Sequence, residues 1–316
     1  MGVSFMSASV LSPISIPVWK DQAVLTEDQI RCYRANGFVS MDCLANSDEV
    51  ATVRSILEDM VRNKIGANEG SQYDTLAADE PKGPPKSVEI SGPMSYAPAL
   101  RSLNFLHTAT ALARQILGPD AKLSGDFLLL KPAKSGTGTP WHQDEAYRDP
   151  RFIHKEVTVW IPLQDVCEQN GCMVFVPGSH KRGIYRHQSP GNDKRIAALE
   201  CPDAASMPNP VACPLPAGGC TLHDGETLHR TTNNLSSSPR YAYILNFHVP
   251  PTLSKEVKSF PWLDEKQSFQ REQKRAWMLR GGVFVMIWRR IRRRGLWDTS
   301  GLRYDIQRVV NALHKH

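Results

Sequence analysis

Between residues 120 and 250 the chain consists of short apolar runs separated by turn-forming residues, and this pattern limits the possible fold more than any other feature. The runs are rich in β-branched and aromatic side chains, which favours strands over helices. The six runs are Leu123–Lys131, Val157–Leu163, Met173–Val176, Val211–Leu215, Gly219–His223 and Tyr241–Val249. Many short strands in succession predict an all-β sandwich or barrel. Pro214 cannot donate a ladder hydrogen bond, so the fourth run is expected at a sheet edge.

Helical signals flank this β region. Thr26-Glu27-Asp28-Gln29 has the form of a capping box and Asn36-Gly37 that of a helix end, which together predict a short helix. A strand is predicted over 38–42, and helices over 47–63 and 103–117. Residues 64–95 are rich in Gly, Pro and charged residues and are expected to form a long loop, for example a lid over a pocket.

The expected organisation has three parts. Residues 1–25 form an irregular arm, residues 26–250 form the main domain with a β core from about 120, and residues 251–316 form a basic helical extension. The hydrophobic content of 41% excludes a wholly disordered chain. No run of 18 apolar residues is present, which excludes a membrane-spanning helix. Seven cysteines, an odd number, favour free thiols in a reducing compartment, so a cytoplasmic location is expected.

The positive charge is concentrated near the C-terminus. The net charge is +6, yet nine Lys and Arg residues against one acidic residue lie between Arg271 and Arg294. The remainder of the chain is therefore slightly acidic, which argues against a nucleic-acid-binding body. Within residues 278–294 apolar residues alternate with arginines, a pattern typical of a basic amphipathic helix. Such a helix can contact an anionic membrane surface, attract a phosphate-bearing substrate or pack on the barrel, and the sequence leaves these alternatives open.

The segment Trp141-His142-Gln143-Asp144 carries the first sign of chemistry. Its imidazole and carboxylate are two residues apart at a strand end, so they point to the same side. A third metal ligand must come from a distant strand, and His229 is the best candidate, with His223 as the alternative. Two imidazoles and one carboxylate on one face leave three adjacent coordination positions open, an arrangement that suits ferrous iron in oxygenases.

Arg240 follows His229 by eleven residues. If one strand ends at His229 and the next begins at Arg240, both side chains can face the same cavity. A guanidinium binds a carboxylate through two charge-assisted hydrogen bonds. A dicarboxylate such as 2-oxoglutarate could therefore bind iron at one end and Arg240 at the other. Taken singly, His142 is more often a structural histidine and Arg240 a surface ion-pair residue; the combination favours the metal site.

The order and spacing of these motifs resemble the phytanoyl-CoA dioxygenase family of iron(II)/2-oxoglutarate oxygenases. The resemblance extends from about Leu25 to Val249. The matching segments are Thr26 with Tyr33–Phe38, Trp141–Asp144, Val159–Leu163, Asn170–Met173, Val176–His180, and His229 with Arg240. The resemblance implies a mainly β fold, a double-stranded β-helix or jelly-roll barrel that binds metal at its mouth. Helices at the N-terminal side and a helical C-terminal tail would flank it.

The resemblance also implies roles for individual residues. His142, Asp144 and His229 match the iron ligands, and Arg240 matches the partner of the C5-carboxylate of 2-oxoglutarate. The family's halogenase relatives lack the acidic ligand, so the aspartate favours hydroxylation or a related oxidation.

Two more residues are expected near the cosubstrate. Trp160 matches a residue that lines the cosubstrate pocket, and Lys131 lies where family members often carry a cation or an amide. Tyr147, Arg148 and Glu145 either line a substrate pocket or belong to a solvated loop.

The reaction that the resemblance implies consumes O2 and 2-oxoglutarate, releases succinate and CO2, and oxidises a small organic molecule such as a lipid, an acyl thioester or a secondary metabolite. The alternative is a non-catalytic or hydrolytic metal-binding jelly roll whose basic tail docks to a membrane or a partner. Neither the substrate nor the oligomeric state can be predicted from the sequence.

Overall fold

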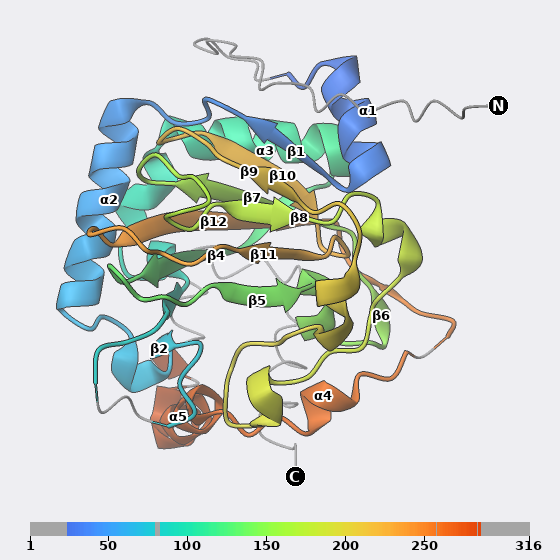
Figure 1. Ribbon diagram of the computed structural model, residues 1–316. Helices are drawn as coiled ribbons and strands as arrows, with labels where there is room; N and C mark the ends of the chain where they lie inside the picture. The colour runs from blue at the N-terminus through green and yellow to red at the C-terminus, as the bar shows by residue number, and fades with distance from the viewer. Residues whose placement is uncertain (1–23, 80–82, 257, 283, 286–316) are drawn as a thin grey trace.

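Two antiparallel sheets that face each other form the centre of the molecule (Figure 1). The computed structural model describes residues 24–79, 83–256, 258–282, 284 and 285. The larger sheet has the order β1-β10-β7-β12-β4-β3-β2 and the smaller one the order β5-β11-β8-β9. The larger sheet contains β1 (Phe38–Met41), β2 (Gln72–Asp74), β3 (Val88–Ser91), β4 (Lys122–Lys131), β7 (Glu156–Pro162), β10 (Cys220–Asp224) and β12 (Arg240–His248). The smaller sheet contains β5 (Thr139–His142), β8 (Met173–Phe175), β9 (Val211–Cys213) and β11 (His229–Thr231), and β6 (Phe152–Ile153) pairs separately with β13 (Thr252–Leu253).

This arrangement confirms the predicted jelly-roll fold. Each of the six predicted strands is present, with ends that differ from the prediction by one or two residues. β9 lies at an edge of the smaller sheet, as Pro214 required. The helices also agree: α1 (Glu27–Asn36), α2 (Ser47–Arg62) and α3 (Asn104–Leu117). Thr26 and Gln29 cap α1 reciprocally, and Gly37 ends it at a φ of 86°.

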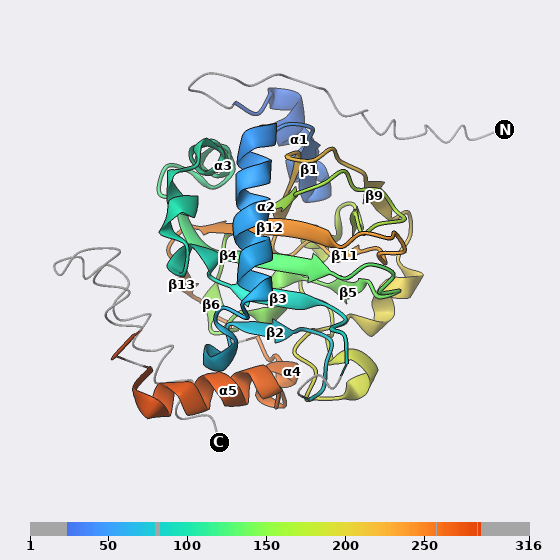
Figure 2. The same ribbon diagram turned by 90° about the vertical axis from the view of Figure 1, so that its left-hand side faces the viewer.

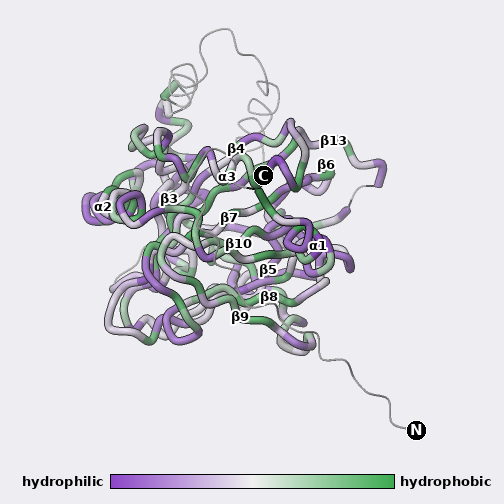
Figure 3. The backbone as a smooth tube through the Cα atoms, turned by 90° about the horizontal axis from the view of Figure 1, so that it is seen from above, coloured by the Kyte–Doolittle hydropathy of each residue, from purple (hydrophilic) through white to green (hydrophobic). Residues whose placement is uncertain are grey.

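Helices α2 and α3 cover the outer face of the larger sheet (Figure 2). Along β7, successive side chains point to opposite faces of the larger sheet. Val157, Val159 and Ile161 enter the core under the helices, whereas Thr158 and Trp160 point to the inside of the barrel. Apolar residues follow the central strands, and hydrophilic residues lie mainly in loops and on helix surfaces (Figure 3). Burial of each large apolar side chain contributes about 1.5–3 kcal/mol, so this core fixes the sheet that supports the site.

The prediction of one long loop over residues 64–95 is wrong. This segment contains β2 and β3, which extend the larger sheet beyond β4, and the short 3-10 helix η1 (Ala67–Glu69). Val88 and Ile90 are 6% and 0% exposed, and this alternating burial is what holds β3 on β4. Strands of three and four residues are too short to stand out in a segment rich in Gly and Pro.

The C-terminal extension contributes α4 (Pro261–Asp264) and α5 (Phe269–Trp277). A π-helical segment follows over Met278–Gly282, where Gly281 has a φ of 94° and interrupts the helix. Most of the predicted basic helix over 278–294, and most of the arm 1–25, lie outside the described residues. No helix in the described part of the chain is long and apolar enough to cross a membrane. The three-part division of the chain remains a prediction.

Candidate metal centre

The structure brings together the three predicted metal ligands. His142 is the last residue of β5, His229 is the first residue of β11, and the two are register partners across the smaller sheet. Asp144 follows at the start of the 3-10 helix η4 (Asp144–Tyr147). The Nε2 atoms of His142 and His229 lie 3.6 and 3.7 Å from Oδ1 of Asp144. The three ligand atoms lie within 4.8 Å of one another, close enough to bind one metal ion.

Backbone carbonyls orient both imidazoles. Nδ1 of His142 donates to the carbonyl of Pro140, and Nδ1 of His229 donates to that of Thr227, each at 2.8 Å. This leaves the Nε2 lone pairs directed at the carboxylate. Burial lowers the pKa of each imidazole to about 4, so both are neutral and able to bind a metal at neutral pH.

The carboxylate of Asp144 is held from its other side. Thr158, on the inner face of β7, donates its hydroxyl hydrogen to Oδ2 at 2.8 Å, which leaves Oδ1 free for a metal. Burial alone would raise the pKa of Asp144, but the neighbouring imidazoles, His229 above all, outweigh it and hold the pKa well below its usual range. Sequence reasoning missed Thr158. The available signal was a hydroxyl residue at an inward position between Val157 and Val159.

His223, the alternative third ligand, lies beside the cluster. Its Nε2 is 3.6 Å from Oδ2 of Asp144, and its ring centroid is 4.6 Å from that of His229. In contrast to the other two imidazoles, neither of its nitrogens has a hydrogen-bond partner in the described part of the chain. The geometry therefore favours His229 as the third ligand and makes His223 a buried neighbour of the site.

Arg240, Lys131 and Trp160 also lie together inside the barrel. Arg240 and Lys131 are register partners on β12 and β4, and each is 1% exposed. The guanidinium carbon of Arg240 lies 5.6 Å from the ring centroid of Trp160. Burial lowers the pKa of Arg240 to about 9 and that of Lys131 well below its usual value. Neither cation is paired with a carboxylate among the residues that the structure describes, so an anion is needed here.

The surrounding donors fit a dicarboxylate. Nε and Nη2 of Arg240, Nε1 of Trp160 and the hydroxyl of Thr221 are all buried without a partner in the described structure. On β7 and β10, Thr158 pairs with His223 and Trp160 with Thr221. Two residues, roughly 7 Å along a strand, thus separate the metal-facing positions from those that face Arg240. The donor set matches an elongated anion with one end at the metal centre and the other at the guanidinium.

Gln143, between the two ligands of the motif, points the opposite way and is fully buried. Its Nε2 donates to the carbonyls of Gly183 and Glu226, at 2.9 and 2.7 Å. Its Oε1 accepts from the backbone N–H of Tyr185 at 2.8 Å. Sequence reasoning did not single it out, although the period-2 alternation of strands places the middle residue of His-x-Asp on the other face. Gln143 fixes the position of both neighbouring ligands.

Of the three residues after the motif that were left undecided, Tyr147 stands at the site. Its ring lies edge-on to His142 with 6.0 Å between centroids, and it is 41% exposed. Arg148 instead pairs with Glu156, which also accepts from Asn246. Glu145 is 5% exposed, and burial raises its pKa to about 8.

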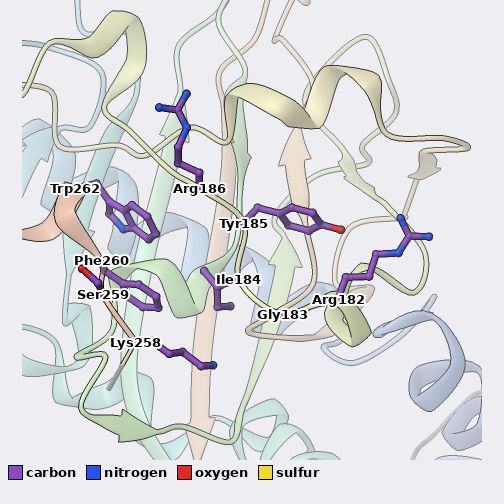
Figure 4. Close-up of a pocket in the computed structure, with 9 residues that line it drawn as sticks. All are labelled: Arg182, Gly183, Ile184, Tyr185, Arg186, Lys258, Ser259, Phe260 and Trp262. Atoms are coloured by element: carbon purple, nitrogen blue, oxygen red, sulfur yellow. The ribbon is translucent and has the colours of Figure 1, made fainter. Parts of the chain in front are cut away.

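A separate surface pocket of about 400 Å³ lies outside the barrel (Figure 4). Its walls are the segments 182–186 and 258–262, and it does not include the metal cluster. Phe260 and Trp262 stack in it with centroids 4.9 Å apart. Nε1 of Trp262 donates to the carbonyl of Ala146 at 2.9 Å, so this wall supports η4 from outside.

Comparisons with known proteins agree with this geometry. The family model described as phytanoyl-CoA dioxygenase (PhyH) matches residues 33–242. A probable alpha-ketoglutarate-dependent hypophosphite dioxygenase of Stutzerimonas stutzeri is 28% identical, over 70% of this chain and 77% of the relative. The phytanoyl-CoA dioxygenase domain-containing protein 1 of Mus musculus is 24% identical, over 71% of this chain and 90% of the relative.

A solved structure supports the same assignment. EvdO2 from Micromonospora carbonacea var. aurantiaca, complexed with 2-oxoglutarate, is 28% identical and superposes with a TM-score of 0.65. The match covers 76% of this chain and 97% of EvdO2. Because the family model spans most of the chain and includes the metal cluster, the chain belongs to the phytanoyl-CoA dioxygenase family.

Proposed function

We propose that this protein is an Fe(II)/2-oxoglutarate-dependent dioxygenase that uses O2 to hydroxylate an unactivated C–H bond of a small organic molecule, with release of succinate and CO2. The observation that carries the proposal is the pairing of two sites inside one barrel. His142, Asp144 and His229 form a metal-ligand cluster with neutral imidazoles, and Arg240 is a buried cation without an anion in the described structure.

Each residue has a defined task in this proposal. Nε2 of His142, Nε2 of His229 and Oδ1 of Asp144 hold the iron. Arg240 pairs with the distal carboxylate of 2-oxoglutarate, and Lys131 and Trp160 lie beside it inside the barrel. When bound, iron and 2-oxoglutarate would activate O2, which is the oxidant, while the protein supplies orientation and excludes water.

The relatives support this reaction class, and they leave the substrate open. One is named for hypophosphite and another for phytanoyl-CoA, and EvdO2 was crystallised with 2-oxoglutarate. The cysteines of the described chain are all free thiols, which supports the proposed cytoplasmic location. Contact with a membrane through residues 278–294 remains a proposal from sequence alone.

Metal and cosubstrate binding test the proposal together. We expect the purified protein to bind one ferrous ion per chain and to convert 2-oxoglutarate to succinate under O2. His142→Ala should lose the metal. His107→Ala, a change at an exposed histidine on α3, should keep it and serves as the matched control. If His142→Ala retains the full metal content and 2-oxoglutarate does not bind, the proposal is wrong. Tight zinc binding without any effect of 2-oxoglutarate would favour the hydrolytic or non-catalytic alternative.

A further inference from the structure

The inner face of β3 carries a carboxylate that the proposed chemistry does not use. Val88 and Ile90 point into the core under the helices, so Glu89 and Ser91 point to the inside of the barrel. Glu89 is the register partner of Leu129 on β4, whose neighbours Leu128 and Leu130 are also in that core. Glu89 therefore lies on the same face of the sheet as Thr158, which holds the metal-binding aspartate.

Two donors hold this carboxylate by the same oxygen. Tyr73, directly opposite on β2, donates its hydroxyl hydrogen to Oε1 of Glu89 at 2.8 Å. Ser91 donates to the same Oε1 at 2.9 Å. In the described part of the chain no hydrogen bond reaches Oε2. The side chain is thus fixed in orientation and keeps one oxygen available for a ligand.

Tyr147 connects this carboxylate to the metal centre. Its ring stands edge-on to His142, and its hydroxyl oxygen accepts from the N–H of Leu199 at 2.7 Å. Burial, and then the charges of Asp144 and Glu89, raise the pKa of Tyr147, which places it within the field of both carboxylates. The ring of Tyr147 thus stands next to a metal ligand, and 41% of this residue is exposed.

The surroundings of Glu89 act on its charge. Burial first, and then the charge of Asp144, raise its pKa, while the two hydroxyl donors and the field of Lys274 on α5 oppose this rise. Helix α5 packs on the end of η1, just before β2, since a Cβ on Gly70 would lie only 2.9 Å from the carbonyl oxygen of Gln270. Oε2 is not among the buried partnerless atoms of the described residues, so it remains accessible, and a ligand that displaces water from it must bring a donor of its own.

We propose that Glu89 determines substrate specificity: its Oε2 accepts a hydrogen bond from a hydroxyl or an ammonium group of the substrate while a nearby C–H bond faces the metal. This inference rests on the proposed function, because it places the substrate inside the same barrel as the metal centre. It identifies the substrate class as molecules with a hydrogen-bond donor a short distance from the oxidised carbon. A substrate that is only hydrocarbon at this position would leave the carboxylate unpaired.

Three fragments of the same shape test the proposal. Cyclohexanol offers a neutral donor, cyclohexylammonium a charged donor, and cyclohexanone an acceptor only. Saturation-transfer NMR would measure their binding to the full chain loaded with zinc and 2-oxoglutarate. The variants are Glu89→Ala and Glu89→Gln, and the control is Glu27→Gln at an exposed position on α1. Glu89→Gln keeps an acceptor for Tyr73 and Ser91, so it should fold even if Glu89→Ala does not.

We expect one or both donor fragments to bind the wild-type protein more tightly than cyclohexanone. Glu89→Ala should weaken that donor fragment roughly tenfold and leave cyclohexanone unchanged. Glu89→Gln should weaken cyclohexylammonium more than cyclohexanol, and the fragment that responds identifies which donor the site prefers. Equal binding of all three fragments, no donor binding, or no effect of either variant would overturn the proposal. The signal of 2-oxoglutarate is read in the same spectra, and its absence would instead refute the proposed function.

Discussion

Replacing Arg240 with methionine should stabilise the metal-free protein while it abolishes 2-oxoglutarate binding. The buried guanidinium has its pKa lowered from the ordinary 12.5 to about 9. Each pKa unit corresponds to about 1.4 kcal/mol, so keeping this buried group charged lowers the free energy of unfolding by about 5 kcal/mol. Because the folded-state pKa is the lower one, the cost is fully present at neutral pH and fades only as pH rises from about 9 to 12.5.

Methionine keeps most of the side-chain volume and removes the charge. It gives up one long hydrogen bond, from Nη1 to the carbonyl of Leu129 at 3.4 Å, and the contact with Trp160. It also removes the repulsion from Arg240 that, after burial, lowers the pKa of Lys131. After these losses and relaxation, we expect a net gain of about 1–3 kcal/mol in the free energy of unfolding.

Urea denaturation of the metal-free protein, with and without 2-oxoglutarate, measures both effects. The midpoint of Arg240→Met should rise, and 2-oxoglutarate should raise the midpoint of the wild type only. Arg54→Met is the matched control: Arg54 is paired with Glu58 on α2 at 2.8 Å, so its loss should not stabilise the protein. The reasoning is refuted if Arg240→Met lowers the midpoint as Arg54→Met does, or if 2-oxoglutarate still stabilises it.

Other predictions concern the metal centre and its surroundings. Thr158→Val should weaken metal affinity about 10–100-fold because the carboxylate loses its orienting donor, while Thr158→Ser should retain it; equal affinities in a metal titration would contradict this. Gly171→Ala should reduce 2-oxoglutarate affinity, measured by calorimetry, because Gly171 has a φ of 99° and a Cβ would lie 3.0 Å from Nε of Arg240; unchanged affinity would show that the cosubstrate binds elsewhere. The metal-free protein should lose several kcal/mol of stability as pH falls from 6.5 to about 4, because the unfolded chain takes up protons that the buried His142 and His229 do not. A urea midpoint that does not change over this pH range would contradict the assignment. So would a double variant, His142→Gln with His229→Gln, whose midpoint falls as steeply with pH as that of the wild type.

Local patterns predicted the strands and the first three helices well because each signal lies within one short segment. The capping box of α1 and the apolar run of β7 each depend on neighbours in sequence. The convergence of His142 and His229 is different, since 87 positions separate these two register partners. The motif order and family resemblance indicated it; periodicity alone could not.

The parts that could not be predicted depend on which face of a strand is inward. Thr158 and Glu89 are ordinary polar residues in sequence, and only the register of β7 and β3 shows that they lie on the inner face of the larger sheet. Glu89 was also missed because the segment that contains it, residues 64–95, was predicted to be a loop. The free Oε2 of this residue exists only because Tyr73 and Ser91 bind the other oxygen, a geometry that no sequence pattern records.

Among the described residues, the side chain of Gln143 forms hydrogen bonds only with main-chain groups, those of Gly183, Tyr185 and Glu226. The residues whose side chains line the outer pocket next to it, such as Ile184 and Arg186, take no part in these bonds. Exchange of the Ile184 and Arg186 side chains therefore leaves these bonds in place as long as the chain path is preserved, whereas Trp262, which supports η4, must be kept. Directed evolution at Ile184 and Arg186 should yield many variants that differ in surface chemistry and keep the arrangement of the three metal ligands.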